Sequence, residues 1–263
     1  MIIIAGNRFD PTSLISQYPP NSIEVKIIRK LSTSQTVYNY ESLEQLTFEI
    51  KLRINIIKAS KDLYRSRFSF KVFRESTCNP EFWERTNEGG FLLKDGVSPL
   101  NAINDIYINS YMYGTECATA MVIVFYKAVI DVYPKELFDR TFQRIYLMNW
   151  HHIDRDLGVN LYRNITDYIP GDCLYIKNPD VDPETPYWQG ENAIDLGDGY
   201  YYGHGIGIKT IEEMIRILNN FRREGATESA YLTNTATRPD FKHLSNIYYS
   251  YIGQVRAIPA FYL

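Results

Sequence analysis

One long apolar segment constrains the fold of this chain more than any other feature. It follows Glu116 and Cys117 and runs almost without a polar residue from Met121 to Tyr126 and on to Val132. Its composition suits a buried strand as well as a buried helix, but its length, its alanines and the break at Pro134 favour a helix. Cys117 is therefore predicted to lie in the first turn of a buried helix.

The predicted position of Cys117 indicates a reactive thiol. At the start of a helix, unpaired backbone N–H groups and the positive end of the macrodipole favour a thiolate over a thiol. The alternative is a small buried cysteine that packs in the core and never reacts, which is the more common role of a single cysteine. Evidence from other residues of the chain is needed to distinguish these two roles.

Several other segments have the pattern of amphipathic helices. Ser42 and Gln45 suit a capping box, and Ser98 before Pro99 suits a helix start. The predicted helices cover residues 43–64, 99–111 and 135–140 and a segment from Thr210 to Gly225. The charges of the first helix are expected to form a solvated face, made of Lys51, Arg53, Lys58 and Lys61.

Strands are expected mainly in the second half of the chain. They are predicted over residues 144–150 and 172–177 and in a hairpin from Trp188 to His204, with a polar loop over residues 154–167. No linker rich in Gly, Ser or Pro marks a domain boundary. We therefore expect one α+β domain spanning residues 1–263, in which the helix with the cysteine packs on an antiparallel sheet.

The predicted hairpin carries two candidate functional residues. Asp198-Gly199 suits a two-residue type I′ turn. In that register Ala193 lies opposite His204, and Glu191 lies one diagonal step away on the same face. A three-residue loop would instead place Glu191 and His204 on opposite faces. The two-residue turn thus predicts that Glu191 and His204 share a site.

Charge and cysteine content exclude several classes of protein. The chain of 263 residues has a formal net charge of −3, so we expect neither a nucleic acid nor a membrane as partner. The apolar run from Cys117 to Tyr126 is too short to cross a bilayer. The first residues lack the basic region and apolar core of a signal peptide. Three cysteines indicate synthesis in a reducing cytoplasm.

Metal and cofactor sites are also absent from the sequence pattern. Cys117 and Cys173 lack the neighbours of a zinc site, and the acidic residues at 180–184 lack the glycine and spacing of a calcium loop. No glycine-rich phosphate loop follows a predicted strand. We therefore expect neither a metal site nor a phosphate-binding loop.

Four candidates could manage the proton of the thiol. A thiol at a helix start that faces a polar residue on a sheet is typical of cysteine acyl-transfer enzymes. His204 is the default base from its ordinary pKa, with His151-His152 as second choice. Burial would raise the pKa of Glu191 towards that of the thiol. Glu116 suits the same role, and equally that of a carboxylate at the positive end of the helix.

Five strings of the sequence resemble one family. They are residues 48–55, Glu116-Cys117-Ala118-Thr119-Ala120, residues 171–175, Trp188-Gln189-Gly190-Glu191-Asn192 and residues 229–232. In this order, over about residues 48–238, the chain resembles the spore transglutaminases of endospore-forming bacteria, the protein-glutamine gamma-glutamyltransferases. Gln189 and Thr115 depart from the family pattern, in which an arginine and a bulky aromatic residue are expected.

The resemblance implies an activity and assigns roles. The enzyme would have a core similar to papain-like cysteine peptidases and would act without calcium or another cofactor. It would join a protein glutamine to a lysine amine and release ammonia, with spore coat proteins as glutamine donors and lysine acceptors. Cys117 would be the nucleophile, Glu191 its main partner and Glu116 a substitute base, and His204 would lie near the site. Synthesis in the mother-cell cytoplasm and action at the spore coat are implied as well.

A thioester that must meet an amine before water needs a narrow, dry site. We therefore expect a substrate channel lined by Phe70, Trp150 and Trp188, which lie beside the matching strings. Two other functions stay open from the sequence. One is a papain-like cysteine peptidase or amidase that uses Cys117 with His204 and takes water as acceptor. The other is a non-catalytic, tyrosine-rich component of the coat.

Overall fold

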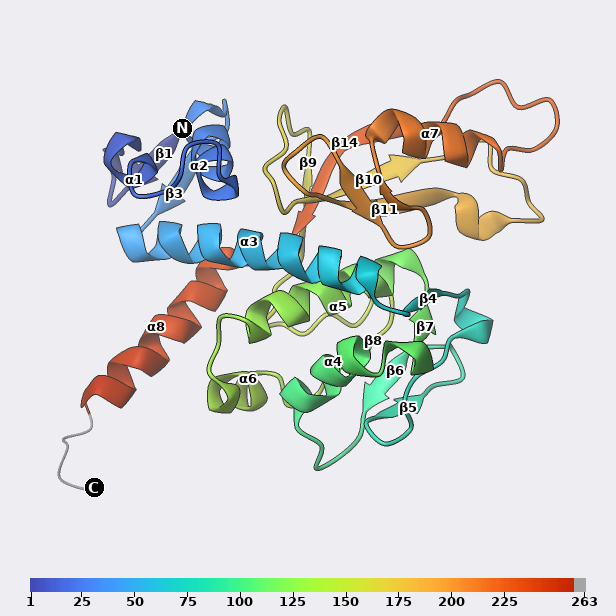
Figure 1. Cartoon of the computed structure of the whole chain (residues 1–263), viewed down its shortest axis with the longest axis horizontal. Coiled ribbons are helices and arrows are strands. Elements are labelled where there is room, and N and C mark those ends of the chain that lie inside the picture. Colours follow the sequence, from blue (N-terminus) through green and yellow to red (C-terminus); the bar gives the residue numbers. More distant parts are fainter. Residues whose placement is uncertain (258–263) are drawn as a thin grey trace.

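A long helix, α3 (Leu43–Arg65), forms the axis of the molecule. The computed structural model describes residues 1–257, with side chains for residues 1–255. Figure 1 shows α3 crossing the molecule, with helices on one side and the main sheet on the other. Ser42 caps the helix by accepting the N–H of Gln45, whose side chain accepts the N–H of Glu41. The predicted helix is confirmed. In a capping box the Gln45 side chain would accept the N–H of Ser42, but here it accepts the N–H of the preceding residue.

The apolar segment forms helix α5 (Cys117–Ile130), as predicted. Its residues are buried except for Cys117, Lys127 and Ile130. It packs against α3, α4 (Pro99–Ile108) and α6 (Lys135–Thr141), and also against strand β11 of the main sheet. A 3₁₀ helix follows α4 at Ser110–Met112, where the sequence predicted a continuing α-helix. The core is therefore built around the helix that begins at the cysteine.

The main sheet has six strands in the order β13-β12-β11-β10-β14-β9, and every neighbouring pair is antiparallel. Its strands are β9 (Asn160–Arg163), β10 (Cys173–Lys177), β11 (Gly190–Asp195), β12 (Tyr201–Gly203), β13 (Gly207–Lys209) and β14 (Tyr231–Arg238). The expected combination of helices with an antiparallel sheet is confirmed. Because α5 packs on β11, the first turn of α5 lies against a central strand.

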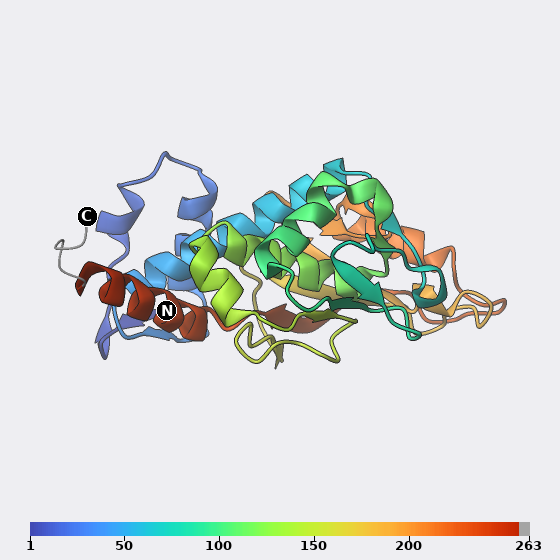
Figure 2. The ribbon, with the colours of Figure 1, turned by 90° about the horizontal axis from the view of Figure 1, so that it is seen from below.

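Smaller elements surround this framework. Figure 2 shows the N-terminal elements and α8 at one end of the elongated molecule, and the main sheet with α7 towards the other. The N-terminal elements are β1 (Ile2–Ile4), β2 (Asn7–Arg8), α1 (Thr12–Ile15), α2 (Ile23–Thr33) and β3 (Tyr38–Tyr40). Short pieces follow α3, namely β4 (Ser69–Phe70), a 3₁₀ helix at Phe73–Glu75, β5 (Trp83–Arg85), β6 (Phe91–Leu93) and β7 (Gly114–Thr115). The remaining elements are β8 (Tyr146–Leu147), a 3₁₀ helix at Pro186–Trp188, α7 (Ile211–Asn219) and α8 (Phe241–Ala257). The single domain over residues 1–263 stays a prediction, and its last six residues lie outside the described part.

Two predictions between residues 144 and 167 are wrong. The strand expected over residues 144–150 is reduced to β8, which pairs with β6 in a small separate sheet. Asn149, two residues after the end of β8, has φ at 51° and so cannot continue an extended strand. The polar loop expected over residues 154–167 contains β9, which pairs with β14 at the edge of the main sheet. All four residues of β9 are exposed, so its sequence lacks the alternation of buried apolar and exposed polar residues that predicts a strand.

The register of the β11–β12 hairpin also differs from the prediction. Ala193 lies opposite Gly203, and Leu196 donates to the carbonyl of Tyr200, which closes a three-residue loop over residues 197–199. Both glycines of this loop, Gly197 and Gly199, have φ above 80°. The chain thus uses its glycines at the two left-handed positions of a longer loop. Consequently Ala193 does not lie opposite His204.

Arg53 does not belong to a solvated face. Its side chain is fully buried, where its Nε bonds Glu49 at 2.9 Å and its Nη1 bonds Asp172 at 2.7 Å. Asp172 also accepts from Nε and Nη2 of Arg238, at 2.7 Å and 2.6 Å. Burial would raise the pKa of Asp172, but the charges of Arg238 and Arg53 outweigh it and the pKa is lowered. This network joins α3 to β14 and to the residue before β10.

Replacing Arg53 should destabilise the fold strongly. We expect Arg53→Ala to lower the free energy of unfolding by about 3–5 kcal/mol, because it leaves Glu49 and Asp172 buried with fewer partners. Lys51→Ala, at an exposed position of the same helix, should change it by less than about 0.5 kcal/mol. Urea denaturation of the three proteins measures both effects. Equal stability of the two variants would contradict the role assigned to Arg53.

Candidate active site

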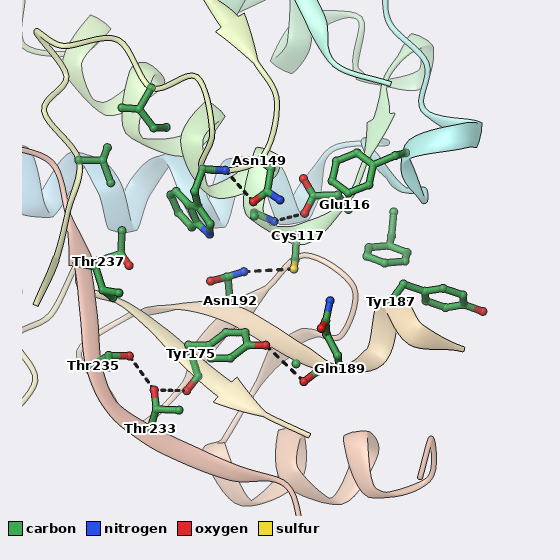
Figure 3. Close-up of a pocket in the computed structure, with 18 of the residues that line it drawn as sticks. Glu116, Cys117, Asn149, Tyr175, Tyr187, Gln189, Asn192, Thr233, Thr235 and Thr237 are labelled. Carbon is green, nitrogen blue, oxygen red and sulfur yellow. Dashed lines mark hydrogen bonds between the residues drawn. The ribbon is translucent and has the colours of Figure 1, made fainter. Parts of the chain in front are cut away.

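A cavity of about 700 Å³ opens beside the first turn of α5. Its walls come from segments far apart in the sequence: the start of α5, the loop after β8, the strands β9, β10, β11 and β14, and the β4 region. Figure 3 shows the residues that line it. Of the predicted site residues, Cys117, Glu116, Phe70 and Trp150 line this cavity.

Cys117 is the first residue of α5, and its sulfur faces Asn192 of β11 (Figure 3). Asn192 Nδ2 donates a hydrogen bond to Cys117 Sγ at 3.4 Å. Burial raises the pKa of the Cys117 thiol well above its ordinary value, and the charges of Glu191 and Glu116 raise it further. The hydrogen bonds from Asn192 act in the opposite direction. The thiol is therefore protonated in the resting protein.

The prediction that the helix start favours a thiolate is wrong here, and Glu116 is the reason. Its carboxylate is the N-cap of α5 and accepts the N–H groups of Ala118 at 2.6 Å and Thr119 at 2.7 Å. These are the donors that would otherwise stabilise a thiolate. The cap also places a carboxyl group next to the sulfur. The positive end of the helix thus serves the carboxylate rather than Cys117.

Glu116 also fixes part of the cavity wall. The hydroxyl of Thr119 donates to Glu116 Oε1 and accepts the N–H of Asn149 at 2.7 Å. Asn149 Oδ1 in turn accepts the N–H of Trp150 at 2.7 Å. Burial raises the pKa of Glu116, although hydrogen bonds from Thr119, Ala118 and the Cys117 thiol act in the opposite direction. The helix cap therefore holds the loop that carries Trp150.

Glu191 is fully buried on β11 and does not line the cavity, whereas its neighbour Asn192 does. Its Oε1 accepts the N–H of Gly205 at 3.2 Å. A Cβ atom at Gly203 would lie 2.6 Å from Oε1, so this position requires glycine. Burial raises the pKa of Glu191 to about 8, with a further contribution from the charge of Glu116. The carboxyl group accordingly keeps a proton at neutral pH, and its charge at higher pH acts on Cys117.

Both ring nitrogens of His204 have partners other than Cys117. Its Nε2 lies 3.2 Å from the carbonyl oxygen of Ser69 and its Nδ1 lies 3.0 Å from the hydroxyl of Tyr202. Since a carbonyl only accepts, Nε2 carries the hydrogen and Nδ1 accepts from Tyr202. The ring stacks on Phe68, and burial lowers the pKa of His204 to about 4. His204 is thus a neutral ring that joins the hairpin to β4, and the predicted face shared with Glu191 does not form.

The predicted aromatic lining is divided. Phe70 and Trp150 line the cavity. Trp188 does not, because its ring is stacked between Phe70 and Phe221, with centroid distances of 5.5 Å and 4.5 Å. Tyr187, next to Trp188, lines the cavity in its place. Trp188 thus supports the wall from behind Phe70.

Several cavity residues were missed by sequence reasoning. A row of threonines, Thr233, Thr235 and Thr237, faces the cavity from alternate positions of β14. Asn192 was missed as well. It stands directly after Glu191, so on a strand its side chain lies on the opposite face, and in the structure that face lines the cavity. Leu161 and Arg163 line the cavity from β9, the strand that the sequence did not reveal.

No helix within residues 1–257 has both the length and the apolar character to cross a membrane. Within the same residues, no three His, Cys, Asp or Glu side chains are grouped as they would be around a metal ion. The cavity carries one carboxyl group and one guanidinium group among its lining residues, those of Glu116 and Arg163. The chemistry available at Cys117 is therefore that of a thiol surrounded by amide, hydroxyl and carboxyl groups.

Known proteins resemble this chain over nearly its full length. Residues 1–248 match the family model described as "Protein-glutamine gamma-glutamyltransferase". Proteins of that name from Bacillus mycoides (strain KBAB4) and Bacillus cereus (strain B4264) are 44% and 43% identical over 245 residues, which cover 93% of this chain and 88% of each relative. A solved structure titled "Transglutaminase from Geobacillus stearothermophilus (without C-terminal extension)" superposes with a TM-score of 0.75 at 52% identity, covering 79% of this chain and 98% of that chain.

The raised pKa of Glu191 predicts how stability depends on pH. Folding lifts this pKa from 4.5 to about 8, so between these values the folded protein holds a proton that the unfolded chain has lost. Stability contributed by Glu191 is therefore present below pH 4.5 and is lost as the pH rises to about 8, at roughly 1.4 kcal/mol per pKa unit. Glu191→Gln does not titrate, so it should be more stable than the wild type at pH 8 and equal to it at pH 4.

Thermal unfolding of the wild type and Glu191→Gln across this pH range measures the effect. Glu84→Gln, at an exposed position of β5, is the control and should follow the wild-type curve. A constant difference between Glu191→Gln and the wild type at all pH values would show that Glu191 does not titrate in this range.

Proposed function

The chain belongs to the protein-glutamine gamma-glutamyltransferase family, and from this premise we propose that it cross-links proteins of the spore coat through a thioester at Cys117. The activity itself is that of the family, an acyl transfer from a protein glutamine to an amine. The resemblance predicted from the sequence is confirmed by the family match and by the named relatives. The same comparisons do not support the two alternatives from the sequence, a peptidase or a non-catalytic coat component.

Cys117 carries the proposed chemistry, and the supporting observation is the position of its sulfur. Sγ faces a cavity at the start of a buried helix, with an amide donor within 3.4 Å. Attack of the sulfur on the glutamine side-chain amide forms a C–S bond, and loss of ammonia leaves a thioester. A lysine amine then attacks the same carbon, the C–S bond breaks and the isopeptide bond remains.

Glu191 is the proposed partner that holds the proton. A thiol with a raised pKa needs a nearby base that is itself difficult to deprotonate, so that the two groups have similar proton affinities. Burial brings the pKa of Glu191 to about 8, and its charge acts directly on Cys117. The ionised form of Glu191, whose share grows as the pH approaches 8, accepts the thiol proton during attack and returns it to the departing ammonia. Glu116 is the weaker candidate base, because hydrogen bonds from Ala118 and Thr119 already stabilise its ionised form.

The surroundings of the site support the finer parts of the proposal. A nucleophile at the start of a helix that packs on an antiparallel sheet is the arrangement of a papain-like core. We assign the aromatic side of the cavity, with Phe70, Tyr187 and Trp150, to the exclusion of water from the thioester. Independence from calcium, synthesis in the mother-cell cytoplasm and action at the spore coat belong to the same proposal, and they rest on the resemblance to Bacillus proteins.

The activity is tested by incubating the protein with casein and a labelled primary amine in EDTA. We expect covalent incorporation of the amine into casein, and none with Cys117→Ala. Cleavage of casein without incorporation would instead indicate a peptidase. Incorporation by Cys117→Ala would exclude the thioester mechanism, and activity that returns only when calcium is added would exclude independence from calcium.

Glu191 and His204 should differ in their effect on turnover. We expect Glu191→Ala to lower kcat by at least about 100-fold, the usual scale for loss of a general base, and His204→Ala to lower it less. The reason is that both His204 nitrogens bond groups outside the cavity. Steady-state rates of amine incorporation, with unfolding midpoints as a check on folding, measure the order. The reverse order would favour a Cys–His mechanism.

A further inference from the structure

Asn192 donates a side-chain hydrogen bond to the reacting sulfur. It lies on β11 with 8% of its surface exposed, and its Nδ2 donates to Cys117 Sγ at 3.4 Å. Figure 3 shows its amide directed across the cavity at Cys117. Glu191, the preceding residue, has its carboxyl group beside Gly203 and Gly205 instead. One strand thus presents a proton carrier and an amide donor to the surroundings of the same thiol.

A second donor stands beside the sulfur on the main chain. The start of α5 offers several N–H groups, and the Glu116 side chain accepts those of Ala118 and Thr119. The N–H of Ala120 bonds the carbonyl of Glu116. For the N–H of Cys117, residues 1–257 supply no hydrogen-bond acceptor. This group is therefore free to bond an acceptor in the cavity.

The acyl transfer needs donors of this kind. When sulfur attacks the glutamine amide, the C=O double bond becomes a single bond to a negatively charged oxygen, which lies within about 3 Å of donors that stabilise it. The site already contains the carboxyl groups of Glu116 and Glu191, which disfavour added negative charge. Uncharged donors held in place by a strand and a helix provide stabilisation without recruiting a cation.

We propose that Asn192 is a catalytic residue whose side-chain amide, together with the backbone N–H of Cys117, binds the oxyanion formed on the glutamine carbonyl. This inference rests on the proposed thioester mechanism at Cys117. In the resting enzyme Asn192 Nδ2 donates to sulfur. When the C–S bond forms, the negative charge leaves the sulfur for the oxygen, and the donor follows it.

The same two donors serve both halves of the reaction. In the first half the oxyanion collapses, the C–N bond breaks and ammonia leaves with the proton from Glu191. In the second half the lysine nitrogen attacks the thioester, an oxyanion forms again, and the C–S bond breaks as Glu191 takes the amine proton. Asn192 gains and loses no proton in either half. Its loss should therefore slow both acylation and transfer to the amine.

Comparing two reactions of Cys117 isolates this role. Ammonia release from a glutamine-containing peptide in the presence of a primary amine passes through an oxyanion, whereas alkylation of Cys117 by iodoacetamide does not. We expect Asn192→Leu and the nearly isosteric Asn192→Asp to lower kcat for ammonia release by about 100-fold or more, with alkylation slowed less than about tenfold.

Asn178 provides a matched control for the substitution to leucine. It follows β10, donates to the carbonyl groups of Trp188 and Leu218, and does not line the cavity. Asn178→Leu should leave the ratio of the two rates unchanged. Equal losses in ammonia release and alkylation for both Asn192 variants would overturn the assignment, because Asn192 would then act only on the sulfur. Absence of ammonia release by the wild type would overturn the thioester mechanism itself.

Discussion

The arrangement of this molecule depends on one buried carboxylate, that of Asp172, shared by two arginines. Arg53 reaches it from α3 and Arg238 from β14, and the backbone of Asp172 leads directly into β10. Since β10 pairs with β11 in a fixed register, this network also fixes the position of β11 relative to α3 and α5. Charges that are costly to bury alone become orienting contacts when all three are paired.

In the active site, by contrast, the buried ionisable groups are not paired with cations. Glu116, Glu191 and Cys117 lie close together in a buried region, and no arginine or lysine bonds the two carboxyl groups or the thiol in the described residues. Without a cation nearby, such groups are most stable in a buried site when they keep their protons. Burial therefore raises the pKa values of Glu191 and Cys117 together. Proton exchange between carboxyl and thiol follows from this matching, and a histidine is not needed for it.

The sequence allowed prediction of features that local patterns encode. The apolar run, the helix caps and the catalytic cysteine at the helix start follow from spacing and chemistry within a few residues. Arg53 was misplaced because its partner Asp172 lies 119 residues away in the sequence. The hairpin register was off by one because two glycines suit either loop length. β9 is exposed throughout, so its place at the sheet edge depends on pairing with β14 alone.

The central claim is that the pKa of Glu191 lies near 8, so that its ionised form is a base strong enough to take the proton of Cys117. Its carboxyl carbon, labelled with ¹³C and assigned by its absence in Glu191→Gln, can be followed by NMR across the pH range of the folded protein. The midpoint of this titration should lie near 8 in the folded protein. A midpoint near the ordinary value of about 4.5 would contradict this claim, because ionised Glu191 would then be too weak a base to take the proton of the Cys117 thiol.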